Sequence, residues 1–168
     1  MEDEQMRQPD YRQLVDDIEN TPRIIQELLV DMNENDLRAR PPDGSWSILE
    51  HMCHLRDIEQ EGYRVRIDQM INQTHPFLRD MDGDRLADER GYNDQDFGSA
   101  LETFISNREI NVRAIRDLSP AQLSRQAMFE NVGPLNFLEL LIKMREHDRG
   151  HVRELTELRG GSFARLTY

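Results

Sequence analysis

The fold of this chain is decided by one stretch, Trp46-Ser47-Ile48-Leu49-Glu50-His51-Met52-Cys53-His54-Leu55. Within it, Ser47 and Glu50 have the S-x-x-E spacing of a capping box, which marks the start of a helix. Apolar residues then recur every three or four positions, at Ile48, Met52, Leu55 and Ile58. This period predicts an amphipathic helix that runs to about Ile71.

Three other segments have the same period of apolar residues. The first spans residues 11–32 and contains Pro22, which either kinks one helix or opens a second. Another spans about 96–118, and the last spans 137–158, where Gly160-Gly161 is expected to stop it. The sequence therefore predicts four long helices.

The connections between these segments complete the predicted topology. Residues 72–93 lack a regular period and predict a long crossover between helices two and three. Residues 127–135 contain Gly133-Pro134 and indicate a turn or a small hairpin. No strand alternation is long enough to build a sheet, and no shift in composition divides the chain. We expect a single all-α domain, 1–168, folded as a four-helix bundle with one neighbouring pair parallel.

Composition and charge exclude several classes of function. Of the 168 residues 37% are hydrophobic and 32% charged, as in soluble globular proteins. The net charge of -12 opposes binding to nucleic acid or to an anionic membrane surface. The acidic N-terminus lacks the features of a secretory signal, and one cysteine cannot form an intramolecular disulfide. We expect a cytoplasmic protein.

The fourth predicted helix carries a pair of candidate metal ligands, His147 and His151. A spacing of four places both rings on one face of the helix, within its apolar stripe. A divalent metal would accept both nitrogen lone pairs. Alternatively, each histidine is a core residue bonded to a carbonyl, because H-x-x-x-H pairs also arise by chance.

The opening stretch makes a family resemblance specific. The run from Trp46 to Leu55 is similar to the W-S-x-x-E-x-x-x-H-L signature of the DinB/YfiT-like superfamily. The Pro-Gly-rich segment before Trp46, the long crossover and the Gly-Pro-Leu entry to the last helix also resemble that family. The resemblance implies that His54 joins His147 and His151 in binding one divalent metal, and that water or substrate completes the coordination shell. Zinc or nickel fits best, and iron or manganese also accepts such ligands.

Other polar residues near the signature have alternative roles. Glu50 is a candidate general base, although capping of the helix is the favoured interpretation. His51 lies three positions before His54 and is set aside as a partly exposed residue. Cys53 and Asp148 neighbour ligand histidines in the chain, but adjacent helical residues point about 100° apart, so both should face elsewhere.

Three functions follow from the resemblance. Members of the family include bacillithiol S-transferases and mycothiol-dependent maleylpyruvate isomerases, which favours a metal-dependent transferase that uses a low-molecular-weight thiol. A metal-dependent hydrolase acting on a small molecule is the second hypothesis. A metal-binding stress protein without turnover is the third. Family relatives often pair, so we also predict a homodimer.

Overall fold

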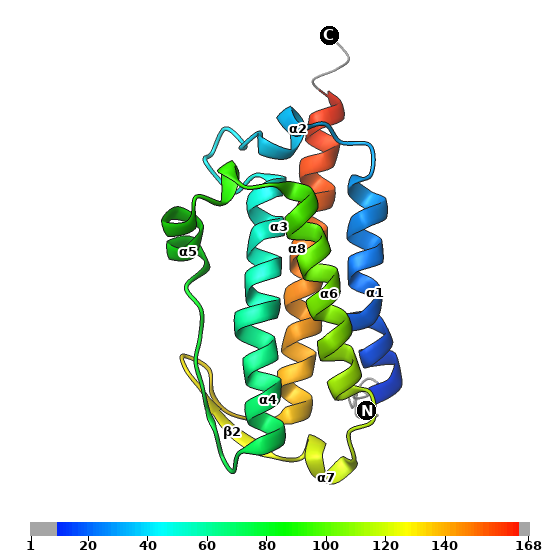
Figure 1. Cartoon of the computed structure of the whole chain (residues 1–168), viewed down its shortest axis with the longest axis vertical. Helices are drawn as coiled ribbons and strands as arrows, with labels where there is room; N and C mark the ends of the chain where they lie inside the picture. Colours follow the sequence, from blue (N-terminus) through cyan, green and yellow to red (C-terminus); the bar gives the residue numbers. More distant parts are fainter. Residues whose placement is uncertain (1–9, 165–168) are drawn as a thin grey trace, which may run out of the picture.

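Four long helical segments run side by side along the molecule (Figure 1). The computed structural model describes residues 10–164, with side chains as far as residue 160. The segments are α1 (Tyr11–Leu29), α3 (Ile48–Asp57) continued through η1 (Ile58–Tyr63) and α4 (Arg64–Asn72), α6 (Phe97–Ile115) and α8 (Phe137–Ala164). The four-helix bundle is confirmed. Because α1 packs beside α8 and α3 beside α6, each pair running in one direction, two neighbouring pairs are parallel where one was predicted.

The first helix continues through Pro22, so the alternative of a second helix opening there is wrong. A proline lacks an N–H, which leaves the carbonyl of Ile18 without its usual helical partner. Arg108 of α6 supplies one, because its Nη1 donates to the Ile18 oxygen at 2.6 Å. A side chain from a neighbouring helix thereby satisfies the backbone of α1.

The predicted capping box is present at the start of α3. Ser47 Oγ accepts from the Glu50 N–H at 3.1 Å, and Glu50 Oε2 accepts from the Ser47 N–H at 2.9 Å. The helix then runs to Asn72 as predicted, with one wide π-helical turn in η1. There the Glu59 carbonyl accepts from the N–H of Arg64, five residues later, and from Asn111 Nδ2 at 3.2 Å.

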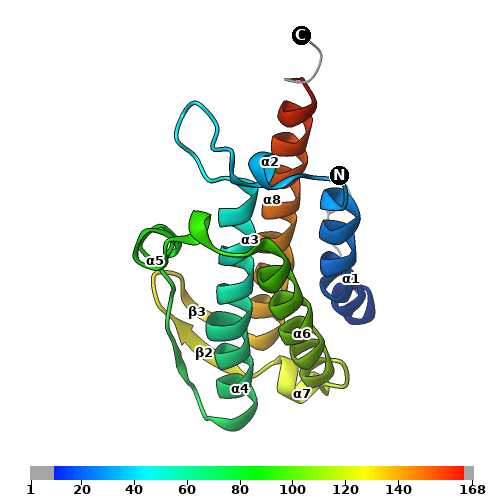
Figure 2. The same ribbon diagram turned by 45° about the horizontal axis from the view of Figure 1, so that its top comes forward.

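The predicted crossover is confirmed in its place, but it is not an irregular loop. It contains β1 (Phe77–Leu78), the short helix α5 (Gly83–Arg90) and the 3₁₀ turn η2 (Tyr92–Asp94). Asp82 caps α5 by accepting from the N–H of Arg85 at 3.0 Å, and Gly91 ends it with a φ of 57°. In Figure 2, α5 lies against α3 on the side away from α1.

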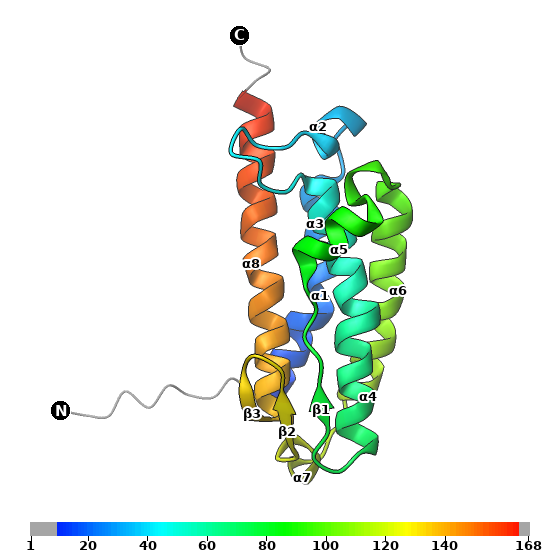
Figure 3. The ribbon, with the colours of Figure 1, turned by 90° about the vertical axis from the view of Figure 1, so that its left-hand side faces the viewer.

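A small sheet lies at the end of the bundle where α8 begins (Figure 3). The hairpin of β2 (Gln126–Phe129) and β3 (Gly133–Asn136) is antiparallel and confirms one of the two predicted alternatives. Strand β1 adds in parallel beside β2, with Leu78 opposite Phe129. The expectation of no sheet was therefore wrong, because strands of two to four residues carry too little alternation to be recognised. The remaining short helices are α2 (Glu34–Arg38) and α7 (Pro120–Leu123).

The last helix passes through Gly160-Gly161 and reaches Ala164, so these glycines do not stop it. A glycine inside a helix costs about 1 kcal/mol relative to alanine, which weakens a helix without ending it. The positive φ that would mark a glycine C-cap occurs at Gly91 in the described chain but not at Gly160.

The core consists of two apolar clusters with polar side chains between them. One cluster lies toward the sheet and includes Ile18, Ile115 and Leu141. The other lies toward the opposite end and includes Leu49 and Phe104. Among residues 10–164, no helix is long and apolar enough to cross a membrane.

Candidate metal centre

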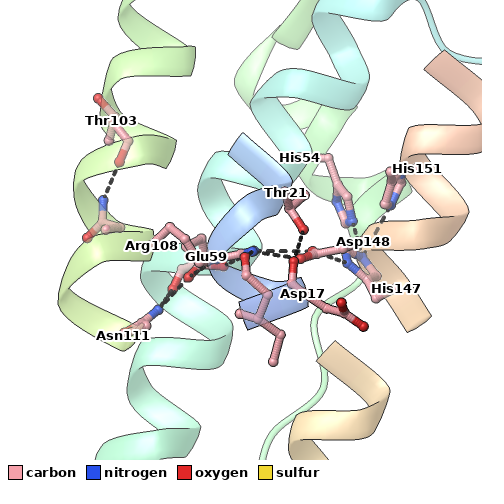
Figure 4. A network of polar contacts seen from close by, with 12 residues as sticks. Asp17, Thr21, His54, Glu59, Thr103, Arg108, Asn111, His147, Asp148 and His151 are labelled. Carbon is pink, nitrogen blue, oxygen red and sulfur yellow. Dashed lines mark hydrogen bonds and ion pairs between the residues drawn. The ribbon is translucent and has the colours of Figure 1, made fainter. Parts of the chain in front are cut away.

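Three histidines from two helices converge inside the bundle (Figure 4). His54 comes from α3, and His147 and His151 come from α8. The Nε2 atom of His147 lies 3.1 Å from His54 Nε2 and 3.2 Å from His151 Nε2. The structure therefore brings together the three residues that the sequence selected as metal ligands.

Close packing of α5 holds His54 in this place. Gly83 begins α5 directly against the His54 ring. A Cβ atom at Gly83 would lie 2.9 Å from ring atoms of His54 and 3.2 Å from Trp46. Only a residue without a side chain lets the crossover approach the histidine this closely.

The geometry of the three histidines fits a divalent cation. Nitrogens bound to a tetrahedral zinc at about 2.0–2.1 Å lie about 3.3 Å from one another. His147 Nε2 faces two other ring nitrogens, and as one atom it cannot both donate to one and accept from the other. A cation accepts all three lone pairs at once. Within the described residues, the Nδ1 atom of His147 is buried without a hydrogen-bond partner, which is unusual for a purely structural histidine.

Burial favours the neutral form of the His54 and His151 imidazoles, which is the form that binds a metal. Burial, together with the neighbouring histidines, lowers the pKa of His54 to about 3 and that of His151 to about 2. It also lowers the pKa of His51 to about 4.

Sequence reasoning set His51 aside, but the structure places it beside the cluster. His51 is only 7% exposed, and its Nδ1 lies 2.9 Å from Nδ1 of His151. The carboxylate of Glu154 lies 3.3 Å from the same His151 nitrogen and 3.6 Å from His51 Nδ1. The spacing of three between His51 and His54 was the available signal, since such residues lie on neighbouring positions of a helix face.

A buried ion network lies beside the histidines (Figure 4). The guanidinium of Arg108 donates to both carboxylate oxygens of Glu59 at 2.8 Å, and to Asp148 at 2.7 and 3.2 Å. Asp148 thus bonds to Arg108 and also lies against the cluster, with its Oδ1 3.9 Å from His147 Nδ1, so the prediction that it faces elsewhere is wrong. Burial alone would raise the pKa of Asp148, but Arg108 holds it below the ordinary value. The only sequence signal was a charged residue, Arg108, in an apolar stripe.

The other sequence candidates lie outside the cluster. The carboxylate of Glu50 accepts from the Ser47 N–H and from the guanidinium of Arg40. Although burial raises the pKa of Glu50, those partners leave it below the ordinary value. Its role as a base stays a prediction. Cys53 is buried with its Sγ 3.7 Å from the Tyr92 carbonyl, and burial raises the pKa of the thiol to about 11.

A pocket of about 680 Å³ opens beside the cluster. His51 of α3 and His151 of α8 both line it, so it reaches the edge of the histidine cluster. The Trp46 ring covers the histidines, with its centroid 5.0 Å from His54 and nearly parallel to His151 at 6.5 Å. The tryptophan of the signature therefore serves as a wall of the site.

The fold and the site together define a helical bundle with a cluster of three convergent histidines. The model of the DinB superfamily matches residues 17–155, and the chain belongs to this superfamily. A protein of Oceanobacillus iheyensis, named as an inferred metal-dependent hydrolase, is 23% identical over 86% of this chain and 83% of its own length. YfiT from Bacillus subtilis, described as a probable metal-dependent hydrolase with an unusual four-helix bundle topology, superposes with a TM-score of 0.83. The match is 18% identical and covers 94% of this chain and 90% of YfiT, which establishes the shared fold.

Proposed function

We propose that this protein is a metal-dependent hydrolase that binds one divalent ion on His54, His147 and His151. The observation that carries the proposal is the convergence of three Nε2 atoms beside an open pocket. The hydrolase descriptions of the Oceanobacillus iheyensis protein and of YfiT support the same reaction class. Zinc or nickel is the expected metal, with iron or manganese as alternatives.

The residues around the cluster prepare it for a cation. Glu59 and Asp148 carry two negative charges against the single positive charge of Arg108, so the buried network keeps one excess negative charge near the site. When bound, a divalent ion supplies a Lewis acid that polarises a carbonyl and lowers the pKa of water. In the reaction an ester or amide bond breaks, water giving its hydroxyl to the acyl carbon and a proton to the leaving group.

We assign the role of proton acceptor near the metal to Glu154 in preference to Glu50. Glu50 already bonds to Ser47 and Arg40, whereas Glu154 is half exposed and faces two histidine nitrogens rather than an arginine. Its Oε2 can accept a proton released beside the pocket. The sequence prediction named Glu50, and exchange of each carboxylate for the amide distinguishes the two.

Transfer of a small thiol is the second candidate. One observation favours it: the carboxylates nearest the cluster inside the bundle pair with arginines, so they are not free to act as a base. A thiol that ionises at a metal has little need of a separate base. In the non-catalytic alternative a fourth protein ligand would close the site, and the group formed by His54, His147 and His151 contains no fourth described residue.

Metal content tests the proposal directly. Untagged wild type is compared by plasma mass spectrometry with His147→Ala and with His75→Ala, a control at an exposed histidine of the crossover. We expect near-stoichiometric metal in the wild type and the control, and loss of metal in His147→Ala. Equal trace metal in all three would contradict the site.

Activity then separates the two chemistries. The metal-loaded protein is assayed with p-nitrophenyl esters, and with a small thiol and 1-chloro-2,4-dinitrobenzene. Ester hydrolysis that disappears in His147→Ala, without thiol conjugation, is the expected result. Conjugation alone would replace the hydrolase by the transferase, and neither activity would favour a metal-binding protein without turnover.

We further propose that the chain forms a single domain, pairs as a homodimer, is located in the cytoplasm and acts on a small molecule. The acidic charge continues to oppose nucleic acid as a partner.

A further inference from the structure

The pocket beside the histidines has an acidic lining. It lies between the loop from α2 to α3, the start of α5 and the outer half of α8, which Figure 3 shows close together. Its apolar walls include Trp46, Ile48 and Leu158. Five carboxylates also line it, namely Asp36, Asp43, Asp84, Glu154 and Glu157. No lysine or arginine is among its described lining residues.

These five carboxylates have no lysine or arginine partner among the described residues. Many carboxylates outside the pocket are paired with arginines, as where Arg90 bridges Asp57 and Glu61. Within the described part of the chain, none of the five pocket carboxylates forms an ion pair with lysine or arginine. Their negative charge therefore remains available to a ligand.

His51 gives a second and independent indication of a ligand. It lines the pocket although it is only 7% exposed, and its Nδ1 is occupied by His151. In the described residues its Nε2 atom has no hydrogen-bond partner. A ring nitrogen at a pocket wall that no described protein group engages can bond to a polar group of a bound molecule.

We propose that this pocket binds a small organic cation, a primary amine carried on an apolar body. The carboxylates attract the ammonium group, while the indole of Trp46 packs against the apolar part and adds cation–π attraction. The same charges repel thiol cofactors that carry carboxylates. The identification of this cation as the substrate rests on the proposed function, whereas its binding does not.

Binding can be followed through the single tryptophan of the chain, Trp46. Three probes of similar size are titrated in low salt and followed by Trp46 fluorescence, namely 2-phenylethylamine, 2-phenylethanol and 3-phenylpropanoate. We expect the amine to bind about tenfold more tightly than the alcohol, and the carboxylate most weakly. About 1 M salt shortens the screening length to about 3 Å and should nearly abolish this preference.

A double variant tests the carboxylates themselves. Asp84→Asn with Glu157→Gln should weaken binding of the amine about fivefold, since each exposed charge adds only a small amount to the affinity for a cation. Binding of the uncharged alcohol should be unchanged. The matched control is Glu102→Gln, an exposed acid of α6 outside the pocket, which should bind all three probes like wild type. Equal binding of the three probes, or an unchanged preference in the double variant, would overturn the proposal.

The metal content of the same samples is also measured, so that failure of the cation pocket can be distinguished from failure of the proposed hydrolase. A protein that binds stoichiometric metal without preferring the amine retains the hydrolase and loses the cation pocket. A protein that prefers the amine but binds no metal retains the pocket and loses the hydrolase.

Discussion

Two polar clusters lie next to each other inside this bundle, and they differ in how completely their hydrogen bonds are satisfied. In one, the five N–H groups of Arg108 match five acceptor contacts, on Glu59, Asp148 and the Ile18 carbonyl. In the other, the nitrogens of His54, His147 and His151 face one another. The contrast is visible in Figure 4.

The difference indicates which cluster is structural and which is functional. A network whose buried groups all have partners is complete without any other molecule. Lone pairs that converge on one point need a cation from outside the chain. Unsatisfied groups, more than charge or burial, therefore locate the site in this protein.

The largest expected difference between the two clusters is their response to acid: protonation of the histidines should lower the free energy of unfolding. In metal-free protein the pKa values of His51, His54 and His151 are lowered to about 4 or below, whereas the unfolded chain protonates near 6.5. The unfolded state therefore binds more protons below about pH 6.5, and the free energy of unfolding falls as the pH falls. Each histidine costs about 2 kcal/mol between about pH 7 and pH 5, and the three together about 4–6 kcal/mol.

Urea unfolding followed by circular dichroism, in EDTA across this pH range, measures the effect. Removing one histidine, as in His54→Asn, should reduce the slope of the free energy of unfolding against pH by the equivalent of about one proton. His75→Ala changes an exposed histidine and should leave the slope as in wild type. A stability that does not change between about pH 7 and pH 5 would show that the histidines are not buried in the neutral form.

Replacement of Arg108 should have the second largest effect on the free energy of unfolding. Arg108→Met leaves the buried carboxylates of Glu59 and Asp148 without their partner, so the free energy of unfolding should fall by about 3–5 kcal/mol. The matched control is Arg116→Met, which removes an exposed arginine paired with Glu19 on the surface, and it should change stability little. Urea unfolding measures both, and equal losses would mean that the buried network is not the stabilising one.

The smallest expected effect is on metal affinity, and it is tested at two glycines that lie near the histidines. Gly83→Ala places a Cβ against the His54 ring and should lower metal affinity about tenfold, as is typical when the support of a ligand is disturbed. Gly150→Ala meets no neighbour within 4 Å, so it should leave affinity unchanged and stabilise α8 by about 0.5–1 kcal/mol. Competition titration with a metal indicator measures the affinities. The same affinity in both variants would mean that the contact with Gly83 does not position His54.

Much of the fold was predictable because its signals are local. The capping box at Ser47 and the repeated apolar spacing located the long helices to within a few residues. Strand β1 and helix α5 were not predicted, since their stability comes from contacts with distant segments. Leu78 pairs with Phe129, and α5 lies on α3, and neither contact leaves a periodic pattern in the sequence.

The site divides in the same way. His147 and His151 were predictable from their spacing on one helix, and His54 from its position in a family signature. The place of Glu154 beside His51, and the pairing of Arg108 with Glu59 and Asp148, depend on how separate helices pack. These contacts join residues at least 40 positions apart in the sequence, which spacing within one helix cannot reveal.

The wide turn at Ile58–Tyr63 has a consequence for insertions and deletions. A π-helical turn absorbs one additional residue without rotating the helical segments on either side of it. His54 before the turn and Arg66 after it can therefore keep their faces when the residue count between them changes by one. A homologue that lacks the additional residue should align with a single gap inside this turn, and with both halves of the helix still in register.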